Sequence, residues 1–552
     1  MLHCTDLTVR VGHDGPVLLH GVTARFAPGG LHAVIGPSGC GKTTMMKAIL
    51  GLIPATGVKR FGDSPIDAES VAGRVGFAPQ FTTALPQLTV DEALGYQLEL
   101  SVGDAAERVR RLEAVLTTTG LAPHRDKRVS ALSGGQLRRL SLGLELTLNP
   151  PALVCDEVTS GLDPTSEQSI LTLLRGLCHD EGKTAICIIH NLAALDRFDT
   201  VTVVFKGHVV FQGPLPLLLD HFGIPDALRL YTVLEEQPVE HWLALRGAVP
   251  GADDTGGTYA VVEPAPRPGA MSQLGTLLGR RMLLFFRDHG YLALTLAITF
   301  GFPVMVVIFA LKGLPEVPTL ALDSISASME QARTALRVQI ERANIASLSS
   351  GLIMFQIVLL TLMGANNGGR EIAAERTLYE KERITGLRPG AYASSKLVFT
   401  GIVAVFQGLW MAAFVKVICG FPGPWLEQCS MMAACALAMT WVCLGFSALL
   451  ASPEKASLLS IYMVGFQLPL SGVVLALPSA LEWVCRPFVN AYWSWSGYMR
   501  SMENEKIYDA YRETMSAGLV IVTPAEALAA LAIHAALGIG MTVAGCIKRR
   551  PL

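Results

Sequence analysis

The sequence predicts an α/β domain at the front of the chain and an all-α membrane domain of six helices behind it. Up to about residue 245, short apolar runs alternate with helical patterns, which is typical of a mostly parallel sheet covered by helices. A glycine-rich loop follows one of these runs, as in phosphate-binding α/β domains. Beyond residue 270, apolar stretches long enough to cross a bilayer dominate the sequence.

Length and composition support this division. With 552 residues the chain is too long for one soluble core, so at least two domains are expected. Hydrophobic residues make up 51% and charged residues only 16%. Soluble proteins carry about 25% charged residues, so the deficit indicates a membrane protein. The net charge of −2 gives no sign of a nucleic-acid partner.

The N-terminus and the cysteines indicate the compartment of the front domain. The first residues lack a basic stretch followed by an apolar core, so no signal peptide is expected and the front domain should stay in the cytosol. The chain has 11 cysteines and no CxxC pair. A reducing cytosol would keep those of the front part as thiols, namely Cys4, Cys40, Cys155, Cys178 and Cys187.

Apolar runs and composition set the expected domain limits. Buried strands are predicted at residues 31–35, 152–155, 184–189 and 201–205. From residue 247 to residue 269 the composition shifts to Gly, Pro and Asp, which is typical of a linker. The sequence therefore predicts the front domain, the linker and the membrane domain at residues 1–245, 246–270 and 271–552.

The glycine-rich loop fits the phosphate-binding pattern G-x-x-x-x-G-K-[ST] and lies between a predicted strand and a predicted helix. The glycines let backbone N–H groups close around phosphate oxygens at a helix N-terminus, which favours anions. We expect Lys42 to reach the β- and γ-phosphates of ATP and Thr43 to bind Mg²⁺. The loop consists of Gly36, Pro37, Ser38, Gly39, Cys40, Gly41, Lys42, Thr43 and Thr44.

Two adjacent carboxylates follow the second of the four apolar runs. Asp156 and Glu157 come directly after residues 152–155. A strand that delivers a carboxylate beside a phosphate loop is what a magnesium site in an ATPase needs. We expect Asp156 to hold Mg²⁺, and Glu157 to polarise the attacking water as a general base.

Four further motifs resemble those of the ABC-transporter ATPases. Residues 132–136, Leu-Ser-Gly-Gly-Gln, look like the signature motif of that family, and residues 76–80, which end at Gln80, resemble its Q-loop. Residues 160–163, which end at Asp163, resemble the D-loop, and His190 resembles the switch histidine. The motifs cover roughly residues 1–230 in the family's order and spacing.

The resemblance implies roles for these residues. Gln80 would ligate Mg²⁺ and report the nucleotide to the membrane domain, and His190 would contact the γ-phosphate. The signature and D-loop residues would cover the ATP of an opposite subunit, so a second ATPase domain is implied, from a second copy of the chain or a related half-transporter. These residues are Ser133, Gly134, Gly135, Gln136 and Asp163.

The front domain departs from the family pattern at two positions. The family places an aromatic residue before the phosphate loop to stack on adenine, whereas this sequence offers His13 in that region. The family also places Pro after the catalytic glutamate, and here the residue is Val158. Both expected carboxylates are present, so the sequence predicts an active ATPase with His13 as a candidate adenine contact.

Six apolar stretches behind the linker are long enough to cross a membrane, since a spanning helix needs about 20 apolar residues. Clusters of Lys and Arg precede the first, separate the second from the third and follow the sixth, which places both termini and the ATPase domain in the cytoplasm. The expected spans are residues 291–311, 350–369, 397–419, 431–451, 457–477 and 524–547.

The order of the two domains resembles the half-transporters of ABC subfamily G and related type-2 exporters. Residues 271–289 look like the amphipathic connecting helix of that subfamily, and residues 370–383 resemble its cytoplasmic coupling loop. One departure is the long polar segment 312–349, for which the apolar spacing predicts an external amphipathic helix at residues 320–342. Cys429 and Cys485 are both expected outside, either as a disulfide or as thiols.

The predicted function is ATP-driven export. The spans hold few polar side chains, which argues for a hydrophobic or amphipathic, lipid-like cargo rather than a strongly ionic one. Two alternatives remain, a glycan or glycolipid exporter and a non-transporting protein that signals across the membrane. The expected location is the plasma membrane, in bacteria the inner membrane, with ATP and Mg²⁺ as cofactors. The polar residues in or near the spans are Gln356, Gln407, Lys416, Gln467 and His534.

Overall fold

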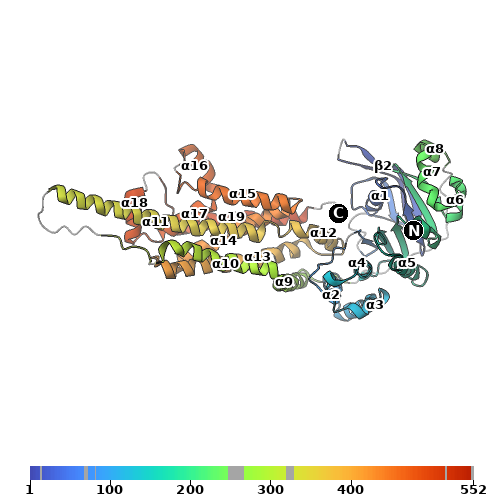
Figure 1. Ribbon diagram of the computed structural model, residues 1–552, viewed down its shortest axis with the longest axis horizontal. Helices are drawn as coiled ribbons and strands as arrows, with labels where there is room; N and C mark the ends of the chain where they lie inside the picture. Colours follow the sequence, from blue (N-terminus) through green and yellow to red (C-terminus); the bar gives the residue numbers. More distant parts are fainter. Residues whose placement is uncertain are drawn as a thin grey trace. The chain divides into compact units, whose positions relative to one another are not determined.

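The computed structural model describes residues 1–12, 15–66, 73–80, 82–245, 266–311, 313–318, 328–475, 477–515 and 519–548. The described chain forms two compact units (Figure 1). The first contains Met1–Thr276 and Thr377–Arg388, and the second contains Leu277–Arg376 and Pro389–Arg549. The short segment Thr377–Arg388, which the sequence places in a loop of the membrane half, thus packs with the first unit.

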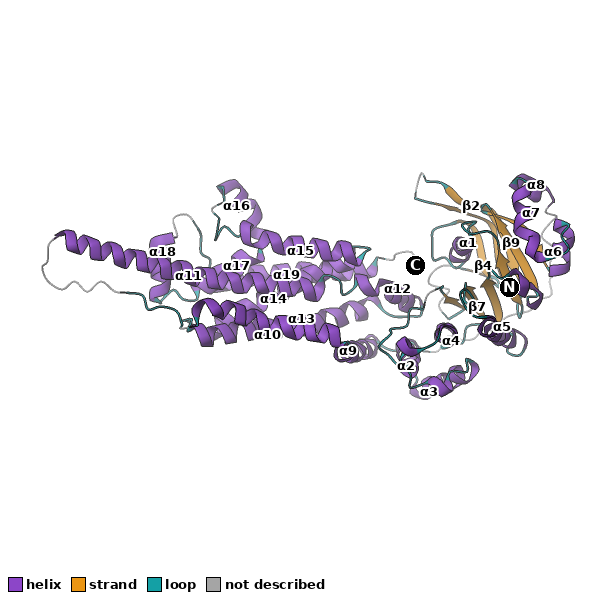
Figure 2. Ribbon diagram, viewed as in Figure 1, coloured by secondary structure: helices purple, strands orange, loops and turns teal. Residues whose placement is uncertain are grey.

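The first unit is built on two sheets, and all strands of the described chain lie in it (Figure 2). A six-stranded sheet has the order β10-β9-β3-β8-β7-β6 and is parallel except for the β9–β10 hairpin. Its strands are β3 (Leu31–Ile35), β6 (Val75–Ala78), β7 (Ala152–Asp156), β8 (Thr184–Ile188), β9 (Thr200–Phe205) and β10 (His208–Gly213).

An antiparallel four-stranded sheet has the order β2-β1-β4-β5. Its strands are β1 (Leu2–Arg10), β2 (Val17–Phe26), β4 (Thr56–Phe61) and β5 (Ser64–Pro65). The α-helices of this unit are α1 (Lys42–Ile49), α2 (Val90–Ser101), α3 (Ala105–Thr118), α4 (Gly134–Leu146), α5 (Pro164–His179), α6 (Leu215–Phe222), α7 (Leu230–Glu236) and α8 (Val239–Leu245). Short 3-10 turns lie at Ala122–His124, Val129–Ala131, Leu192–Arg197 (η3) and Ala227–Arg229 (η4).

Every residue of β3, β7 and β8 is buried, which explains why these strands read as continuous apolar runs. Neighbouring parallel strands end at the same edge of a sheet, where ligands bind in open α/β folds. At this edge β3 leads into the phosphate loop, β7 ends at Asp156 and β8 leads towards His190. The predicted α/β class of the front domain is confirmed.

The second unit is entirely helical among the described residues. Within the part of the chain that the structure describes, five helical runs are long and apolar enough to cross a membrane by length and composition, namely His289–Ala310, Arg333–Ile384, Pro389–Cys419, Trp425–Leu449 and Pro524–Ile547. The α-helices are α10 (His289–Val307), α11 (Ser328–Gly368), α13 (Pro389–Cys419), α14 (Trp425–Leu449), α15 (Pro453–Leu470), α16 (Ser479–Cys485), α17 (Asn490–Arg500), α18 (Lys506–Met515) and α19 (Pro524–Ile547). Two helices contribute to both units, α9 (Ala270–Arg287) and α12 (Arg376–Ile384), and 3-10 turns lie at Ile308–Ala310, Ala373–Glu375 and Arg486–Phe488.

Helix α14 packs against α11, α13 and α19 and forms the centre of this unit. Glycines on the neighbouring helices permit the close approach. A Cβ on Gly538 of α19 would lie 2.4 Å from the backbone of Trp441, and one on Gly408 of α13 would lie 2.6 Å from the Cα of Ala433. Small residues at helix contacts are typical of packing inside a bilayer, where close backbone approach replaces the hydrophobic effect as the driving force.

Two expected elements differ from those observed. The fifth expected span, residues 457–477, corresponds to α15, which ends earlier at Leu470 and is not among the five helices above. Pro469 and the left-handed Gly472 (φ 72°) stop the helix there. The expected external helix 320–342 is not separate: from Ser328 it is continuous with the second span as α11, because residues 328–350 contain no glycine or proline. Residues 320–327 lie outside the described part of the chain.

Candidate nucleotide-binding site

The phosphate loop connects β3 to α1 and has the backbone needed to surround an anion. Gly39 and Gly41 have φ values of 77° and 104°, which L-residues with a side chain rarely adopt. Gly41 is the N-cap of α1, and no side chain caps the N–H groups of the first turn. These N–H groups are therefore left for a ligand, and the helix terminus favours a negative one.

Lys42 lies folded back along the loop. Its Nζ donates to the carbonyl oxygens of Gly36 at 2.8 Å and Pro37 at 3.0 Å. The side chain is buried and has no carboxylate partner among these contacts, so its charge is available to a phosphate. This arrangement fits the triphosphate of ATP.

Thr43 and Asp156 face each other at the edge of the sheet. The Oγ1 of Thr43 donates to Oδ1 of Asp156 at 2.9 Å. Burial raises the pKa of Asp156, with a further contribution from the neighbouring Glu157, so a cation would stabilise this carboxylate. A hydroxyl and a carboxylate are the hard oxygen ligands that Mg²⁺ prefers, so the residues present fit this ion.

Glu157 lies between His190, the predicted switch histidine, and Gln80, which was predicted as a ligand of Mg²⁺. Its Oε2 accepts from Nε2 of Gln80 at 2.7 Å, and its Oε1 lies 2.7 Å from Nε2 of His190. The backbone of Glu157 has a φ of 54°, a strained conformation for a residue other than glycine. The ends of β6, β7 and β8 thus bring together three side chains that are far apart in the sequence.

The signature and D-loop residues lie at helix N-termini that face solvent. Ser133 is the N-cap of α4 and accepts from Gln136 N–H at 3.3 Å, while Gln136 Oε1 accepts from Ser133 N–H at 3.1 Å. Asp163 caps α5 by accepting from the N–H of Ser166 at 3.0 Å. Ser133, Gly134 and Asp163 are exposed, so they are accessible to a second molecule. The predicted adenine contact, His13, lies outside the described residues.

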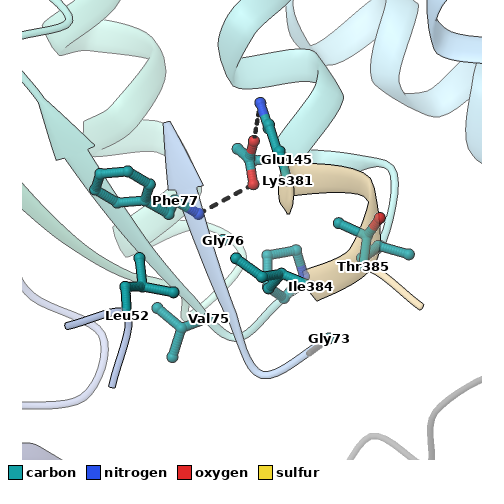
Figure 3. Close-up of a pocket in the computed structure, with 11 residues that line it drawn as sticks. Leu52, Gly73, Val75, Gly76, Phe77, Glu145, Lys381, Ile384 and Thr385 are labelled. Atoms are coloured by element: carbon teal, nitrogen blue, oxygen red, sulfur yellow. Dashed lines mark hydrogen bonds and ion pairs between the residues drawn. The ribbon is translucent and has the colours of Figure 1, made fainter. Parts of the chain in front are cut away.

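The sequence did not predict the role of Glu145, on the helix that starts at the signature motif. Its Oε2 accepts from the N–H of Phe77 in β6 at 3.0 Å, and its Oε1 lies 2.6 Å from Nζ of Lys381 in α12 (Figure 3). The two charged side chains are 6% and 12% exposed. A lone charged residue in the leucine-rich run 140–146 was the available signal.

The segment Thr377–Arg388 makes further contacts in the first unit. A cavity of about 30 Å³ is lined by Ile384 and Thr385 together with Leu52 and the strand that leads to Gln80; Figure 3 shows these side chains around it. The Oγ1 of Thr385 accepts from Nε2 of Gln97 at 3.0 Å. These contacts connect the segment to the strand before Gln80 and, through Gln97, to α2.

A buried cluster of charges lies in the second unit. Arg281 of α9 makes a bidentate ion pair with Glu371, at 2.7 and 2.9 Å, and Lys396 of α13 contacts Glu371 at 2.9 Å and Glu375 at 2.6 Å. Burial would raise the pKa of Glu371, but Lys396 and Arg281 outweigh it and lower the pKa to about 2. The cluster ties the connecting helix to the start of the third span.

The pH dependence of stability should report this cluster. A carboxylate with a lowered pKa stabilises the folded state fully above its ordinary pKa of about 4.5, and the contribution is lost as the pH falls towards 2. We expect detergent-solubilised Glu371→Gln to melt below the wild type at pH 7, and the difference in Tm to narrow below pH 4.5. Thermal unfolding of both proteins between pH 7 and pH 3.5 measures this difference in Tm. A difference that does not change with pH would contradict the assignment.

The polar residues predicted in the spans are mostly paired within the protein. Gln407 accepts from Asn367 at 2.7 Å and donates to Thr299 at 2.9 Å, which joins three helices. Gln467 accepts from the N–H of Ala491, Nε2 of His534 lies 2.5 Å from Pro487 O, and Nζ of Lys416 donates to Gln428 and two backbone carbonyls. Neither oxygen nor nitrogen of the buried Gln356 amide has a partner among the described residues. Cys429 and Cys485 are free thiols.

Comparison with known families gives two matches along the chain. The model described as "ABC transporter" matches residues 19–160, and the one described as "ABC-2 type transporter" matches residues 272–499. The matches come in the order of the two units. Of the candidate residues, those from Gly36 to Glu157 lie within the first match, whereas Asp163 and His190 lie beyond it.

Three curated relatives share parts of the sequence. The chain is 29% identical to "ABC transporter ATP-binding/permease protein Rv1747" of Mycobacterium tuberculosis, over 82% of this chain and 52% of that protein. It is 34% identical to "Methionine import ATP-binding protein MetN" of Caulobacter vibrioides, over 42% of this chain and 71% of that protein. It is 32% identical to "ABC transporter G family member 26" of Arabidopsis thaliana, over 41% of this chain and 34% of that protein.

These relatives and the two matches agree on a family, although the chain spans only 52% of the length of the first relative and 34% of the last. Two of the three are described as ATP-binding proteins, and the first of these is also described as a permease. The chain therefore belongs to the ABC transporter family, as a membrane protein in which an ATP-hydrolysing domain precedes an ABC-2 type membrane domain.

Proposed function

We propose that the chain is a half-transporter that works as a pair of copies and exports hydrophobic or amphipathic, lipid-like molecules. The observation that carries the proposal is the convergence of Gln80, Glu157 and His190 beside the phosphate loop, in a chain that also holds a membrane domain. The domain limits that we propose are residues 1–245 for the ATPase, 246–270 for the linker and 271–552 for the membrane domain.

The geometry supports separate roles in ATP hydrolysis for the side chains that bind phosphate and for those that act on the attacking water. Lys42 leaves its two carbonyl partners to bind the β- and γ-phosphates, while the N–H groups of the loop surround them. Glu157 accepts the proton of the attacking water, and Gln80 and His190 fix the direction of its carboxylate. Thr43, Asp156 and Gln80 would hold Mg²⁺, which would supply positive charge against the phosphate oxygens.

A second copy completes the site in this proposal. Ser133, Gly134 and Asp163 are exposed at helix N-termini, which are suited to an anion brought by another molecule. We propose that Ser133, Gly134, Gly135, Gln136 and Asp163 cover the ATP bound to the partner's phosphate loop. The two ATPase domains would then close on each other only when ATP is bound between them.

The segment Thr377–Arg388 supports a route from this closure to the membrane domain. It lies in the chain between α11 and α13, and its Lys381 is paired with Glu145. Glu145 also holds the strand before Gln80. We propose that movement of α4, the helix that starts at the signature motif and carries Glu145, is transmitted through this ion pair to the two spans that flank the segment.

The lipid-like cargo and the topology rest on the composition of the spans. Few side chains in them carry charge, and Gln407, Gln467 and Lys416 already have partners within the protein. We place the protein in the plasma membrane, in bacteria the inner membrane, with the ATPase domain and both termini in the cytoplasm, from the position of Lys and Arg.

Reconstitution into liposomes tests the proposal. Vesicles of phosphatidylcholine with a labelled phospholipid or a lipophilic dye should show ATP-dependent movement with the wild type and none with Glu157→Gln. Movement of a labelled glycolipid alone would favour the glycan alternative. ATP hydrolysis without movement of any probe would overturn export and favour signalling, for which the exposed Leu336 and Ile340 on the outer end of α11 offer a contact surface.

A further inference from the structure

Tyr231 of α7 reaches the first residue of the phosphate loop. Its hydroxyl oxygen accepts a hydrogen bond from the N–H of Gly36 at 3.2 Å, across 195 residues of sequence. Tyr231 lies beyond residues 19–160, the part of the chain that matches the family model. None of the phosphate-loop, signature or switch motifs includes this residue.

Gly36 is a point where the loop has little freedom. A Cβ at this position would lie 2.1 Å from the carbonyl oxygen of Val204, so the backbone is pressed against β9. The N–H of Gly36 is bound to Tyr231, and its carbonyl accepts from Nζ of Lys42 at 2.8 Å. The residue that Tyr231 holds is therefore the same residue on which the phosphate-binding lysine rests.

Helix α7 is itself fixed to the first unit. Leu230 and Leu234 are fully buried, and the indole N–H of Trp242 donates to the carbonyl of Leu234 at 3.2 Å. The ring of Trp242 also contacts Phe222 with centroids 5.0 Å apart. Because these contacts anchor α7, the position of the Tyr231 hydroxyl is defined before nucleotide binds.

The segment just before α7 contacts a second part of the ATP site. The turn η4 packs against η3, which begins two residues after His190. Asp226 caps η4 by accepting from the N–H of Leu228 at 3.1 Å. Residues 226–231 thus lie between the phosphate loop and the segment that follows the switch histidine.

We propose that Tyr231 is a positioning residue for ATP binding, which acts through Gly36 and Lys42. Its hydroxyl satisfies a buried N–H at the base of the loop and holds the loop in the form that receives the phosphates. Without it, ATP has to order this part of the loop on binding, which weakens binding and leaves the chemical step intact. The proposal rests on ATP hydrolysis and not on the cargo.

The test is the variant Tyr231→Phe in the purified full-length protein. The phenyl ring retains the packing and removes the hydroxyl alone. Loss of one hydrogen bond corresponds to a change of about 5-fold, so we expect the KM for ATP and the Kd for ADP to rise about 5-fold. The kcat at saturating ATP should change less than about 2-fold, because no group that contacts the reacting atoms is altered.

Tyr492→Phe is the matched control, since it also removes one tyrosine hydroxyl, which here donates to the carbonyl of Val520 at 2.8 Å within the second unit. It should lower the melting temperature and leave the KM unchanged. The rise in melting temperature with saturating ADP gives a second measurement, which should shrink in Tyr231→Phe alone. An unchanged KM in Tyr231→Phe, or an equal rise in both variants, would overturn the proposal and leave Tyr231 a purely structural residue.

Discussion

Replacement of Glu157 by glutamine should lower the rate of ATP turnover by about 10²- to 10⁴-fold, which is the range for loss of a general base. The amide keeps the shape of the side chain and can still contact Gln80 and His190, both 2.7 Å from the present carboxylate. It cannot accept the proton of the attacking water. Phosphate release at saturating ATP and Mg²⁺ measures the effect.

ATP binding should survive in this variant. The phosphate contacts come from the loop and Lys42, and Mg²⁺ is assigned to Thr43 and Asp156, none of which changes. The variant should therefore accumulate ATP-bound dimers, detectable by size-exclusion chromatography with labelled ATP. Glu240→Gln, an exposed position at the start of α8, is the control for removal of a carboxylate. Turnover that stays within 3-fold of wild type would exclude Glu157 as the base.

Sequence reasoning located the candidate ATP residues because each lies in a local pattern. Asp156 ends a fully buried strand and Glu157 follows it, and the glycines of the phosphate loop follow another such strand. Such signals depend on a few neighbouring residues. The ends of parallel strands meet at one edge of the sheet, so the residues that follow these strands come together once the sheet forms.

The contacts that sequence reasoning missed join distant positions. Gly36 and Tyr231 are 195 residues apart, and Arg281 and Glu371 are 90 apart. A tyrosine in a short helix or an arginine near a membrane span has an ordinary explanation on its own, so nothing local singles it out. The end of α15 and the length of α11 were missed for a different reason, because apolar composition does not define where a helix ends.

The ion pair between Glu145 and Lys381 should hold the segment Thr377–Arg388 in place. Removal of one partner of a buried pair leaves the other charge unpaired, which typically costs about 3–5 kcal/mol. In Lys381→Met the length of the side chain is kept and only its charge is lost. We expect trypsin to cleave after Arg383 at least about 10-fold faster in this variant, because the segment opens more often. Lys127→Met, at an exposed position of the same unit, is the control.

A double-mutant cycle with Glu145→Gln separates the two roles of the carboxylate. Glutamine can still accept from the N–H of Phe77 through its amide oxygen, so β6 and Gln80 should keep their place and ATP turnover should remain. The charge that faces Lys381 is lost, so cleavage after Arg383 should accelerate. If the ion pair holds the segment Thr377–Arg388 in place, the double variant Glu145→Gln/Lys381→Met should be cleaved more slowly than either single variant. Each single variant leaves one buried charge unpaired, whereas the double variant leaves none. Single effects that simply add would show that the two residues act independently.

In liposomes the single variants should hydrolyse ATP and move less labelled lipid per ATP than the wild type. The step that fails in them lies between closure of the two ATPase domains over ATP and the movement of the spans on either side of α12.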